Sequence, residues 1–410
     1  MENTVTTHAE QGLSWYQNAC RKTVFAALRS LKGAGLEVVE TFDGVSSEQF
    51  FGDKDAKVCG QLTILDPSIY PTLIANGSIG ASEAYVEGKW DSTDLTQLIQ
   101  VFVIAQAQLD KLESSANWLS KLKNTLFHKR NKNSKEQAKQ NILAHYDLGN
   151  ELYTRFLDPE MMYSSAIYPN ANSGLDEAQL HKLKTICERL DLSSEDRVIE
   201  IGTGWGGLAI YAAQNYGCHV TTTTISDAQH EYAEARVKAL GLSDKITLLK
   251  EDYRNLEGQY DKLVSIEMIE AVGHQYYSSF FGKCNSLLKS GGKMLIQAIT
   301  IADQRFEHYK NNVDFIQRYI FPGGCLPSIE VMTKHLRKDT EMVLHELHDI
   351  GLDYAKTLED WRVRFNQNWQ QISEFGFDER FNRLWNFYLC YCEGAFLQRA
   401  TSTVHLVARK

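Results

Sequence analysis

Five short runs of aliphatic and β-branched residues recur through the second half of the chain, and a helical pattern follows each of them. The runs are residues 197–201, 219–223, 245–249, 262–266 and 293–297. Strands separated by helices form right-handed βαβ units and a mostly parallel sheet. A further run at 403–407 is expected to add an antiparallel strand at the edge. The pattern therefore predicts an α/β protein with a doubly wound sheet.

The chain is long enough for two or three domains, with 410 residues. Residues 121–139 carry seven Lys and Arg side chains against one acid, Glu136, which predicts a basic linker over 121–140. Residues 44–65 alternate loosely, and apolar residues recur at helical spacing in 95–112. We therefore expect a smaller N-terminal α+β domain at 1–120 and a catalytic domain at 141–410.

Composition limits the kind of partner. The chain has 43 Lys and Arg against 52 Asp and Glu, a net charge of −9, which argues against a surface built to coat nucleic acid. Its eight cysteines are scattered and lack the double CxxC spacing of a zinc site, so we expect no metal and reduced thiols. The N-terminus resembles no secretory signal, and no apolar run is long enough to span a membrane. A cytoplasmic protein, soluble or peripheral, is expected.

A glycine-rich turn follows the first run, at residues 200–207, and a helix is expected from Leu208. Glycines at this place let backbone N–H groups and the helix N-terminus approach a ligand closely. The spacing GxGxG, preceded by Glu200, departs from the dinucleotide fingerprint GxGxxG. The turn predicts a nucleotide-like ligand at the carboxyl end of the sheet.

Eight motifs in chain order carry a family resemblance. They lie at residues 145–150, 162–164, 200–207, 224–229, 252–254, 265–273, 315–328 and 391–396. With these motifs the chain resembles the cyclopropane-fatty-acyl-phospholipid synthases of the mycolic acid cyclopropane synthase family. The resemblance implies a Rossmann-like class I S-adenosylmethionine-dependent methyltransferase fold with a seven-stranded sheet, and S-adenosylmethionine as cofactor.

The resemblance also implies which residues bind the cofactor. They are Tyr146, Tyr163, Ser164, Gly202, Gly204, Thr224, Gln229, Asp252, Tyr253 and Ile266. Gln229 can donate to and accept from ribose hydroxyls, and Tyr253 offers a flat face to adenine. Ordinary core packing is the alternative for Tyr253, as helix packing and capping are for Tyr146, Tyr163 and Ser164.

The implied reaction transfers a methylene group to the cis double bond of unsaturated phospholipid acyl chains and forms a cyclopropane. In the family a bound bicarbonate is the base. The matching ligand positions are Ser165, Glu270, Gln297, Ile299 through its backbone, and Tyr354. Many members carry Cys and His at the positions of Ser165 and Gln297, and a Gln side chain cannot take up a proton near neutral pH. A methyl- or methylene-branched product therefore stays open beside the cyclopropane.

Lipid access is expected at the inner face of the cell membrane. Six aromatic residues match segments around the family's acyl tunnel: Phe315, Tyr319, Phe321, Trp385, Tyr388 and Phe396. Core packing is the alternative for each ring. The basic stretch at 121–139 could attract anionic headgroups, and the resemblance implies that the N-terminal domain assists lipid binding and pairs two subunits into a homodimer. The other functions considered are a small-molecule N-methyltransferase and a non-catalytic binding protein; nucleic-acid methylation is disfavoured.

Overall fold

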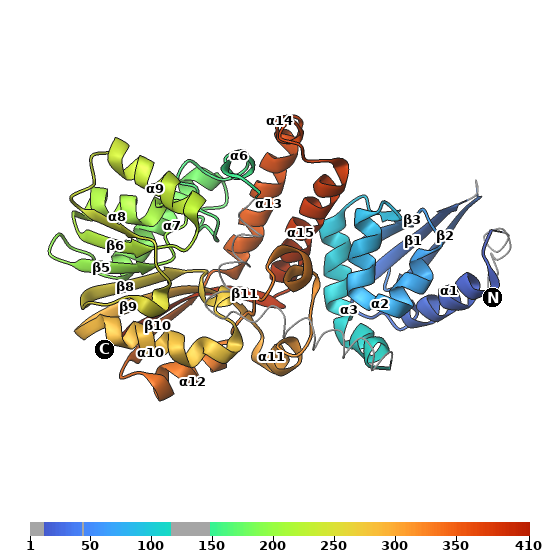
Figure 1. Ribbon diagram of the computed structural model, residues 1–410. Helices are drawn as coiled ribbons and strands as arrows, with labels where there is room; N and C mark the ends of the chain where they lie inside the picture. The colour runs from blue at the N-terminus through green and yellow to red at the C-terminus, as the bar shows by residue number, and fades with distance from the viewer. Residues whose placement is uncertain (1–11, 43–44, 116–147) are drawn as a thin grey trace. The chain divides into compact units, whose positions relative to one another are not determined.

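The computed structural model describes residues 12–42, 45–115 and 148–410, so the basic stretch at 121–139 and Tyr146 lie outside the described residues. The chain divides into two compact units (Figure 1). Of the described residues, 12–42, 45–115 and 376–400 belong to the first unit, and 148–375 and 401–410 belong to the second. Among the described residues, none of the helices combines the length and apolar character needed to cross a membrane.

The first unit is an α+β fold, as predicted for the N-terminal region. Its elements are α1 (Trp15–Leu28), β1 (Gly35–Phe42), β2 (Val45–Gly52), β3 (Cys59–Ile64), α2 (Ile69–Val86), β4 (Trp90–Asp91), α3 (Leu95–Ser115) and α15 (Glu379–Leu397). The sheet has the order β2-β1-β3-β4, with β1 antiparallel to β2 and parallel to β3. Alternate side chains of β3 are buried, which gives the sheet one face for the helices.

Helix α15 packs within this first unit, against α2 and α3, whereas the sequence analysis assigns its residues to the catalytic domain. The side chain of Arg383 donates to the carbonyl oxygens of Tyr85, at 2.7 Å, and Trp90, at 2.9 Å. Thr96 donates to the buried carboxylate of Glu393 at 3.0 Å. These contacts join residues about 300 positions apart, so no local pattern in the sequence reports them.

The second unit holds a seven-stranded sheet, which confirms the predicted fold class. Its strands are β5 (Arg197–Ile201), β6 (His219–Thr223), β7 (Ile246–Leu249), β8 (Tyr260–Ile266), β9 (Leu288–Ile301), β10 (Val343–Asp349) and β11 (Thr401–Arg409). They lie in the order β10-β11-β9-β8-β5-β6-β7. Strands β5 to β9 are parallel, and β11 is antiparallel to β9.

The expectation that the last strand forms the edge is wrong, because β10 pairs with its outer side. Most residues of β10 are exposed or half-buried, in contrast to the buried β11. An exposed edge strand lacks the apolar run by which a buried strand is recognised in a sequence. Two antiparallel strands therefore complete the sheet.

Helices cover both faces of this sheet. They are α6 (Asn150–Tyr153), α7 (Leu175–Arg189), α8 (Gly207–Tyr216), α9 (Asp227–Ala239), α10 (Tyr277–Leu287), α11 (Asp303–Tyr309), α12 (Ile329–Asp339), α13 (Gly351–Gln367) and α14 (Trp369–Ser373). In Figure 1, α7, α8 and α9 lie on one side of the strands and α10 and α12 on the other. Successive side chains of a strand point to opposite faces. Val198 and Val264 accordingly pack with α7 and α8, and their neighbours Ile199 and Leu263 pack with α10 and α12.

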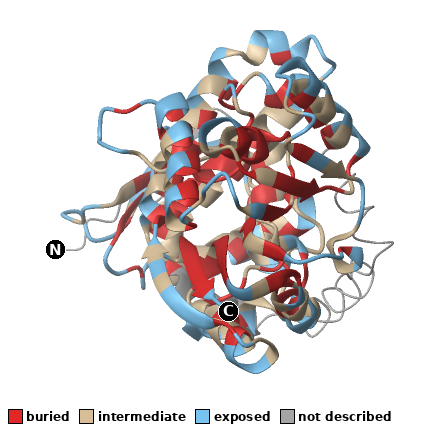
Figure 2. Cartoon of the chain, turned by 90° about the vertical axis from the view of Figure 1, so that its left-hand side faces the viewer, coloured by how far each residue is buried: buried red, intermediate tan, exposed pale blue. Residues whose placement is uncertain are grey.

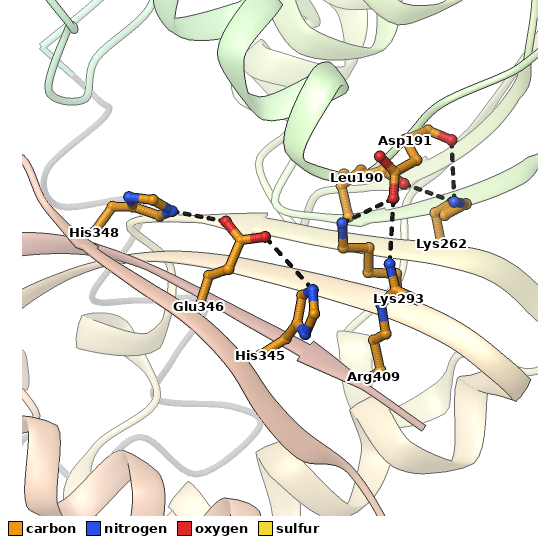
Figure 3. A network of polar contacts seen from close by, with 8 residues as sticks. All are labelled: Leu190, Asp191, Lys262, Lys293, His345, Glu346, His348 and Arg409. Carbon is orange, nitrogen blue, oxygen red and sulfur yellow. Dashed lines mark hydrogen bonds and ion pairs between the residues drawn. The ribbon is translucent and has the colours of Figure 1, made fainter.

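Strands β5, β6 and most of β9 are thus buried on both faces (Figure 2). A polar network lies where β8 begins (Figure 3). Nζ of Lys293 lies 2.9 Å from a carboxylate oxygen of Asp191, and Lys262 donates to the carbonyl oxygen of Asp191 at 3.1 Å. On β10, His348 contacts Glu346 at 2.7 Å. Because parallel sheets bind ligands at the carboxyl ends of their strands, we assign this network a structural role.

Candidate active site

The glycine turn after β5 leaves room for a ligand at the predicted position. Gly202 and Gly204 have φ angles of +105° and +52°, which glycine adopts without strain. A Cβ added at Gly204 would meet nothing within 4 Å, whereas one at Gly207 would lie 2.6 Å from Sδ of Met162. The N–H groups of Gly202 and Thr203 both donate to the carbonyl oxygen of Thr223, which fixes the turn against β6. The backbone at Gly204 is therefore open to close approach.

Glu200, the acid that precedes the glycine turn, supports this turn through hydrogen bonds. It is buried and accepts a hydrogen bond of 2.6 Å from Thr222, whose hydroxyl lies 2.7 Å from that of Thr203. Burial raises the pKa of Glu200 to about 8. This residue thus connects β5 and β6, the two strands that precede the predicted cofactor turns.

The predicted ribose residues come together at the end of β6. The hydroxyl of Thr224 donates to Oε1 of Gln229 at 3.0 Å. Ser226 caps α9 and accepts from the N–H of Gln229 at 3.3 Å, which holds Gln229 in the first turn of the helix. An amide that accepts through Oε1 keeps its N–H groups as donors, so Gln229 suits a ribose hydroxyl.

The predicted adenine residues follow β7, at the same edge of the sheet. The carboxylate of Asp252 accepts from the backbone N–H of Arg254 at 2.9 Å and pairs with its guanidinium at 2.5 Å. The ring of Tyr253 packs edge-on against Phe280, with centroids 5.6 Å apart. Ile266 ends β8, the neighbour of β5, and pairs in register with Gln297 of β9.

Ser164 and Tyr163 differ in their surroundings. The hydroxyl of Ser164 is buried and accepts from Nζ of Lys182 at 2.8 Å, so it anchors the segment before β5. The ring of Tyr163 lies among aromatic side chains, 5.2 Å from Trp361 and 6.5 Å from Phe321 between centroids. Both alternatives considered for these residues, packing and closing over a ligand, agree with these contacts.

A carboxylate that sequence reasoning did not single out lies at the centre of the site. Glu267 follows β8, and its Oε1 accepts from the N–H of Ser165 at 2.9 Å and from Nε2 of Gln297 at 2.7 Å. Its Oε2 accepts from the hydroxyl of Tyr354 at 2.9 Å. Glu267 lies within the motif 265–273, three residues before Glu270, and that position is its only signal in the sequence.

The amide of Gln297 is held in one orientation by its neighbours. Arg189 lies 2.5 Å from Nδ1 of His405, and Nε2 of His405 lies 2.8 Å from Oε1 of Gln297. A guanidinium only donates, so Nδ1 accepts and the imidazole carries its proton on Nε2. Burial and the Arg189 charge lower the pKa of His405 well below its usual value, which keeps the ring neutral. The Gln297 amide therefore directs its N–H groups toward Glu267.

Glu270 is the second carboxylate of the site. Its Oε1 accepts from the backbone N–H of Ile299 at 2.6 Å. Its Oε2 is buried and has no hydrogen-bond partner among the described residues. Burial, and then repulsion by Glu267, raise the pKa of Glu270 to about 8. Near neutral pH the protonated form of Glu270 is thus favoured.

A buried cation accompanies the carboxylates. Lys182 of α7 is fully buried. Burial lowers its pKa to about 8, and the charges of Glu267 and Asp158 act in the opposite direction. In the sequence Lys182 is indistinguishable from the exposed lysines of an amphipathic helix, such as Lys184.

The five positions expected to bind bicarbonate are close together, but they do not fit a separate anion as they stand. Ser165, Gln297 and Tyr354 donate to the Glu267 carboxylate, and Ile299 donates to Glu270. The hydroxyl of Ser165 donates to the carbonyl oxygen of Ala166 at 3.0 Å. A further anion would displace these bonds and approach two carboxyl groups.

The six aromatic residues expected around an acyl chain fall into both units. Phe321 lies near Tyr163, and Phe315 and Tyr319 pack on each other with centroids 5.7 Å apart. Trp385, Tyr388 and Phe396 belong to α15 of the first unit. In addition, the Tyr354 ring lies edge-on to Trp361, with centroids 6.0 Å apart. Because the Tyr354 hydroxyl donates to Glu267, these two aromatic side chains lie next to the Glu267 carboxylate.

Comparisons with known proteins identify the family of this chain. A sequence model of the family "Mycolic acid cyclopropane synthetase" matches residues 133–406. The tuberculostearic acid methyltransferase UfaA1 of Mycobacterium tuberculosis is 37% identical over 78% of this chain and 76% of its own length. The cyclopropane-fatty-acyl-phospholipid synthase of Escherichia coli is 37% identical over 82% of this chain and 85% of its own length.

Solved structures give the same result. The mycolic acid cyclopropane synthase CmaA1, solved with SAH and CTAB, is 26% identical, with a TM-score of 0.61 over 66% of this chain and 98% of that chain. The cyclopropane synthase MmaA2 of Mycobacterium tuberculosis, at 24% identity and a TM-score of 0.62 over 66% of this chain and 98% of that chain, shows the same fold. The resemblance carried by the eight motifs is confirmed. The chain belongs to the mycolic acid cyclopropane synthetase family and has the fold of a class I S-adenosylmethionine-dependent methyltransferase.

Proposed function

We propose that this protein transfers a one-carbon unit from S-adenosylmethionine to the cis double bond of unsaturated phospholipid acyl chains. The observation that carries the proposal is a pair of half-buried carboxyl groups, Glu267 and Glu270, in the segment that follows β8, next to the proposed cofactor turn. A Cβ added at Gly202 would lie 3.5 Å from the side chain of Met268, the residue after Glu267. S-adenosylmethionine, when bound, supplies an electrophilic methyl carbon. The carboxyl groups are thus close to the place where a methyl acceptor would react.

The proposed cofactor residues are the open backbone at Gly204, the Thr224–Gln229 pair and the turn at Asp252 and Tyr253. These three turns follow three neighbouring strands, β5, β6 and β7, and so meet at one edge of the sheet. Ile266, at the end of β8, lies at the same edge. Together they provide hydroxyl, amide and aromatic groups that suit a nucleoside.

The surroundings of the carboxyl groups support an alkene as the acceptor. An alkene that attacks a methyl carbon becomes a carbocation, which water would capture, so the reaction requires a dry site. Trp361 is fully buried and packs against Tyr163 and Tyr354. Aromatic faces stabilise a nearby cation by about 0.5 to 2 kcal/mol. Two relatives of equal identity support lipid chemistry by their names and differ in product.

The same proposal includes work at a membrane surface. Trp15 is 84% exposed and Tyr16 52% exposed at the start of α1, and such aromatic side chains favour the lipid–water interface. We propose a peripheral association with the cytoplasmic face of the cell membrane. The homodimer implied by the family resemblance is part of this proposal. Both can be measured, by vesicle flotation and by light scattering.

The test is product analysis with purified protein. Vesicles of a phospholipid with cis-monounsaturated chains are incubated with S-adenosylmethionine labelled in its methyl group, and the released fatty acids are examined by mass spectrometry. Transfer adds about 14 mass units, one CH₂ by stoichiometry. A cyclopropane resists mild hydrogenation over a catalyst that saturates a methylene branch, which separates the two products. Label found only in an added amine, and none in lipid, would contradict the proposal and favour a small-molecule N-methyltransferase.

A further inference from the structure

We propose that Glu267 supplies a carboxylate base built into the protein, which takes the place of a bound bicarbonate. The inference rests on the proposed function and concerns the proton removed after methyl transfer. Its basis is that the side chains and backbone expected to hold an external anion already donate to this carboxylate.

The hydrogen bonds to Glu267 are those of an anion site. Three donors from three separate segments meet its two oxygens: the N–H of Ser165, the amide of Gln297 and the hydroxyl of Tyr354. The donors come from residues 102, 30 and 87 positions away in the chain. Burial raises the pKa of Glu267, and these three donors, together with the charge of Lys182, act against that rise and favour the ionised form. The same oxygens offer lone pairs to a proton.

The backbone of Glu267 is strained to reach this place. Its φ is +46°, a left-handed conformation that glycine adopts freely and that is strained for other residues. The N–H of Glu267 donates to the carbonyl oxygen of Gln297 at 2.8 Å, and Ile266 pairs with Gln297 in the sheet, which together hold the strained turn. A side chain kept at a position suited to glycine indicates that the carboxylate has a use.

The neighbouring charges divide the roles of the two carboxyl groups. Lys182 is fully buried, and its positive charge acts on Glu267. The amide of Gln297, oriented by neutral His405, donates to Glu267 and does not itself titrate. Glu270 receives a single N–H, from Ile299, and its second oxygen lacks a partner among the described residues. Of the two carboxyl groups, Glu267 is thus better stabilised as the anion, and Glu270 is better suited to remain protonated.

In the proposed reaction Glu267 acts after the methyl group has been transferred. The π electrons of the alkene form a bond to the methyl carbon, and the sulfur–carbon bond breaks with its electron pair on sulfur. One alkene carbon is then cationic. A C–H bond of the new methyl group breaks, its electron pair closes the third C–C bond of the ring, and the proton passes to Glu267, which becomes a carboxylic acid. Loss of a proton from a neighbouring chain carbon to the same carboxylate would give a methyl-branched alkene.

The experiment compares the wild type with Glu267→Gly and Glu267→Gln, with and without bicarbonate, in CO₂-free buffer of fixed pH and ionic strength. Glycine relieves the left-handed backbone and vacates the three donors, so an external anion can enter. Glutamine keeps the size of the side chain and removes the base. Glu231→Gln, on the outer part of α9, is the matched control. Affinity for S-adenosylhomocysteine, measured by calorimetry, reports whether each variant retains the cofactor site.

We expect wild-type turnover to change less than about twofold on removal of bicarbonate. Glu267→Gln should lose about 10²-fold or more, the range of general-base contributions, with its affinity for S-adenosylhomocysteine retained. Glu267→Gly should lose as much and recover at least about tenfold when bicarbonate is added. A wild type that loses about tenfold without bicarbonate would overturn the proposal. So would Glu267→Gln at wild-type rate.

Titration of each protein with bicarbonate alone measures anion binding at this site in the absence of turnover. We expect no binding to the wild type and binding of one bicarbonate to Glu267→Gly; one bicarbonate bound by the wild type would overturn the proposal. The bicarbonate titration also distinguishes failure of the proposal for Glu267 from failure of the proposed function. If no lipid product forms with the wild type, the proposed function fails, while the titration still reports whether Glu267 fills the anion site.

Discussion

Nε2 of Gln297, within β9, donates to Oε1 of Glu267, the residue that follows the neighbouring strand β8, at 2.7 Å. The other end of the same amide meets Nε2 of His405 at 2.8 Å. An amide in this place donates at any pH, whereas an imidazole would donate from Nε2 or Nδ1 according to its protonation. Gln297, where many members of the family carry His, thus supplies a permanent donor to a protein carboxylate.

Replacing this amide by an apolar side chain should destabilise the protein. Gln297→Leu leaves the buried Nε2–H of His405 without its acceptor, which costs about 1 to 3 kcal/mol, and removes one of the two donors to Oε1 of Glu267. Urea denaturation measures the change. Thr300→Val on the same strand is the control, because its hydroxyl makes only a long bond of 3.4 Å, and it should cost less than about 1 kcal/mol. Equal losses of free energy of unfolding in Gln297→Leu and Thr300→Val would contradict the hydrogen bonds assigned to the Gln297 amide.

Glu270→Gln should change the pH dependence of stability. The pKa of Glu270 is about 8 in the folded protein and near 4.5 in the unfolded chain. Between these values the folded state holds the proton and the unfolded state has lost it, so the wild type loses stability as pH rises. Glu270→Gln has no titrating group at this position and therefore does not lose this stability. Its free energy of unfolding relative to the wild type should increase between pH 4.5 and 8, by on the order of 2 to 4 kcal/mol.

Urea denaturation at several pH values measures the difference between Glu270→Gln and the wild type, which removes the contributions of other buried acids such as Glu200. Glu307→Gln is the control, because that carboxylate is exposed and forms an i,i+3 ion pair with Lys310. A constant difference across the pH range would show that Glu270 titrates normally.

Lys182→Met should remove a stabilisation that appears at high pH. The pKa of Lys182 is lowered to about 8, against 10.5 for an exposed lysine. Between these values the folded lysine is neutral and the unfolded one charged, so wild-type stability rises with pH. Relative to Lys182→Met, the wild type should gain on the order of 3 kcal/mol from pH 8 to 10.5. Lys184→Met, an exposed position on the same helix, should show no such gain.

Gly204→Ala should weaken cofactor binding more than it weakens the fold. A methyl group at Gly204 meets no protein atom within 4 Å but occupies the space in front of the turn. The left-handed φ of +52° adds a cost of about 1 to 2 kcal/mol to folding. We expect a loss of at least about tenfold in affinity for S-adenosylhomocysteine by calorimetry, which corresponds to about 1.4 kcal/mol.

Gly217→Ala is the matched control for Gly204→Ala. Gly217 ends α8 with a φ of +71°, and an added Cβ would contact Ser194 at 3.4 Å. The two variants should lose similar stability in thermal denaturation, and only Gly204→Ala should lose affinity. Normal affinity in both variants would place the cofactor elsewhere.

Parts of this protein follow from local patterns in the sequence. The five parallel strands are recognisable because they consist of short aliphatic and β-branched runs, and β5, β6 and most of β9 are buried on both faces. The glycine turn is recognisable because only glycine adopts the φ of Gly202 without strain. The eight motifs indicate the family, which the comparisons confirm.

Other features depend on contacts between distant segments. Helix α15 is assigned by its packing against α2 and α3, and β10 by its pairing with β11. Glu267 has no distinguishing mark beside Glu270 in the sequence, and its role depends on donors from Ser165, Gln297 and Tyr354. The sequence by itself determined the parallel strands of the sheet, the glycine turn and the family, because these depend on residues close together in the chain. Only the tertiary structure decided which carboxylate receives the donors, because a hydrogen bond depends on distances in space between segments up to 102 residues apart.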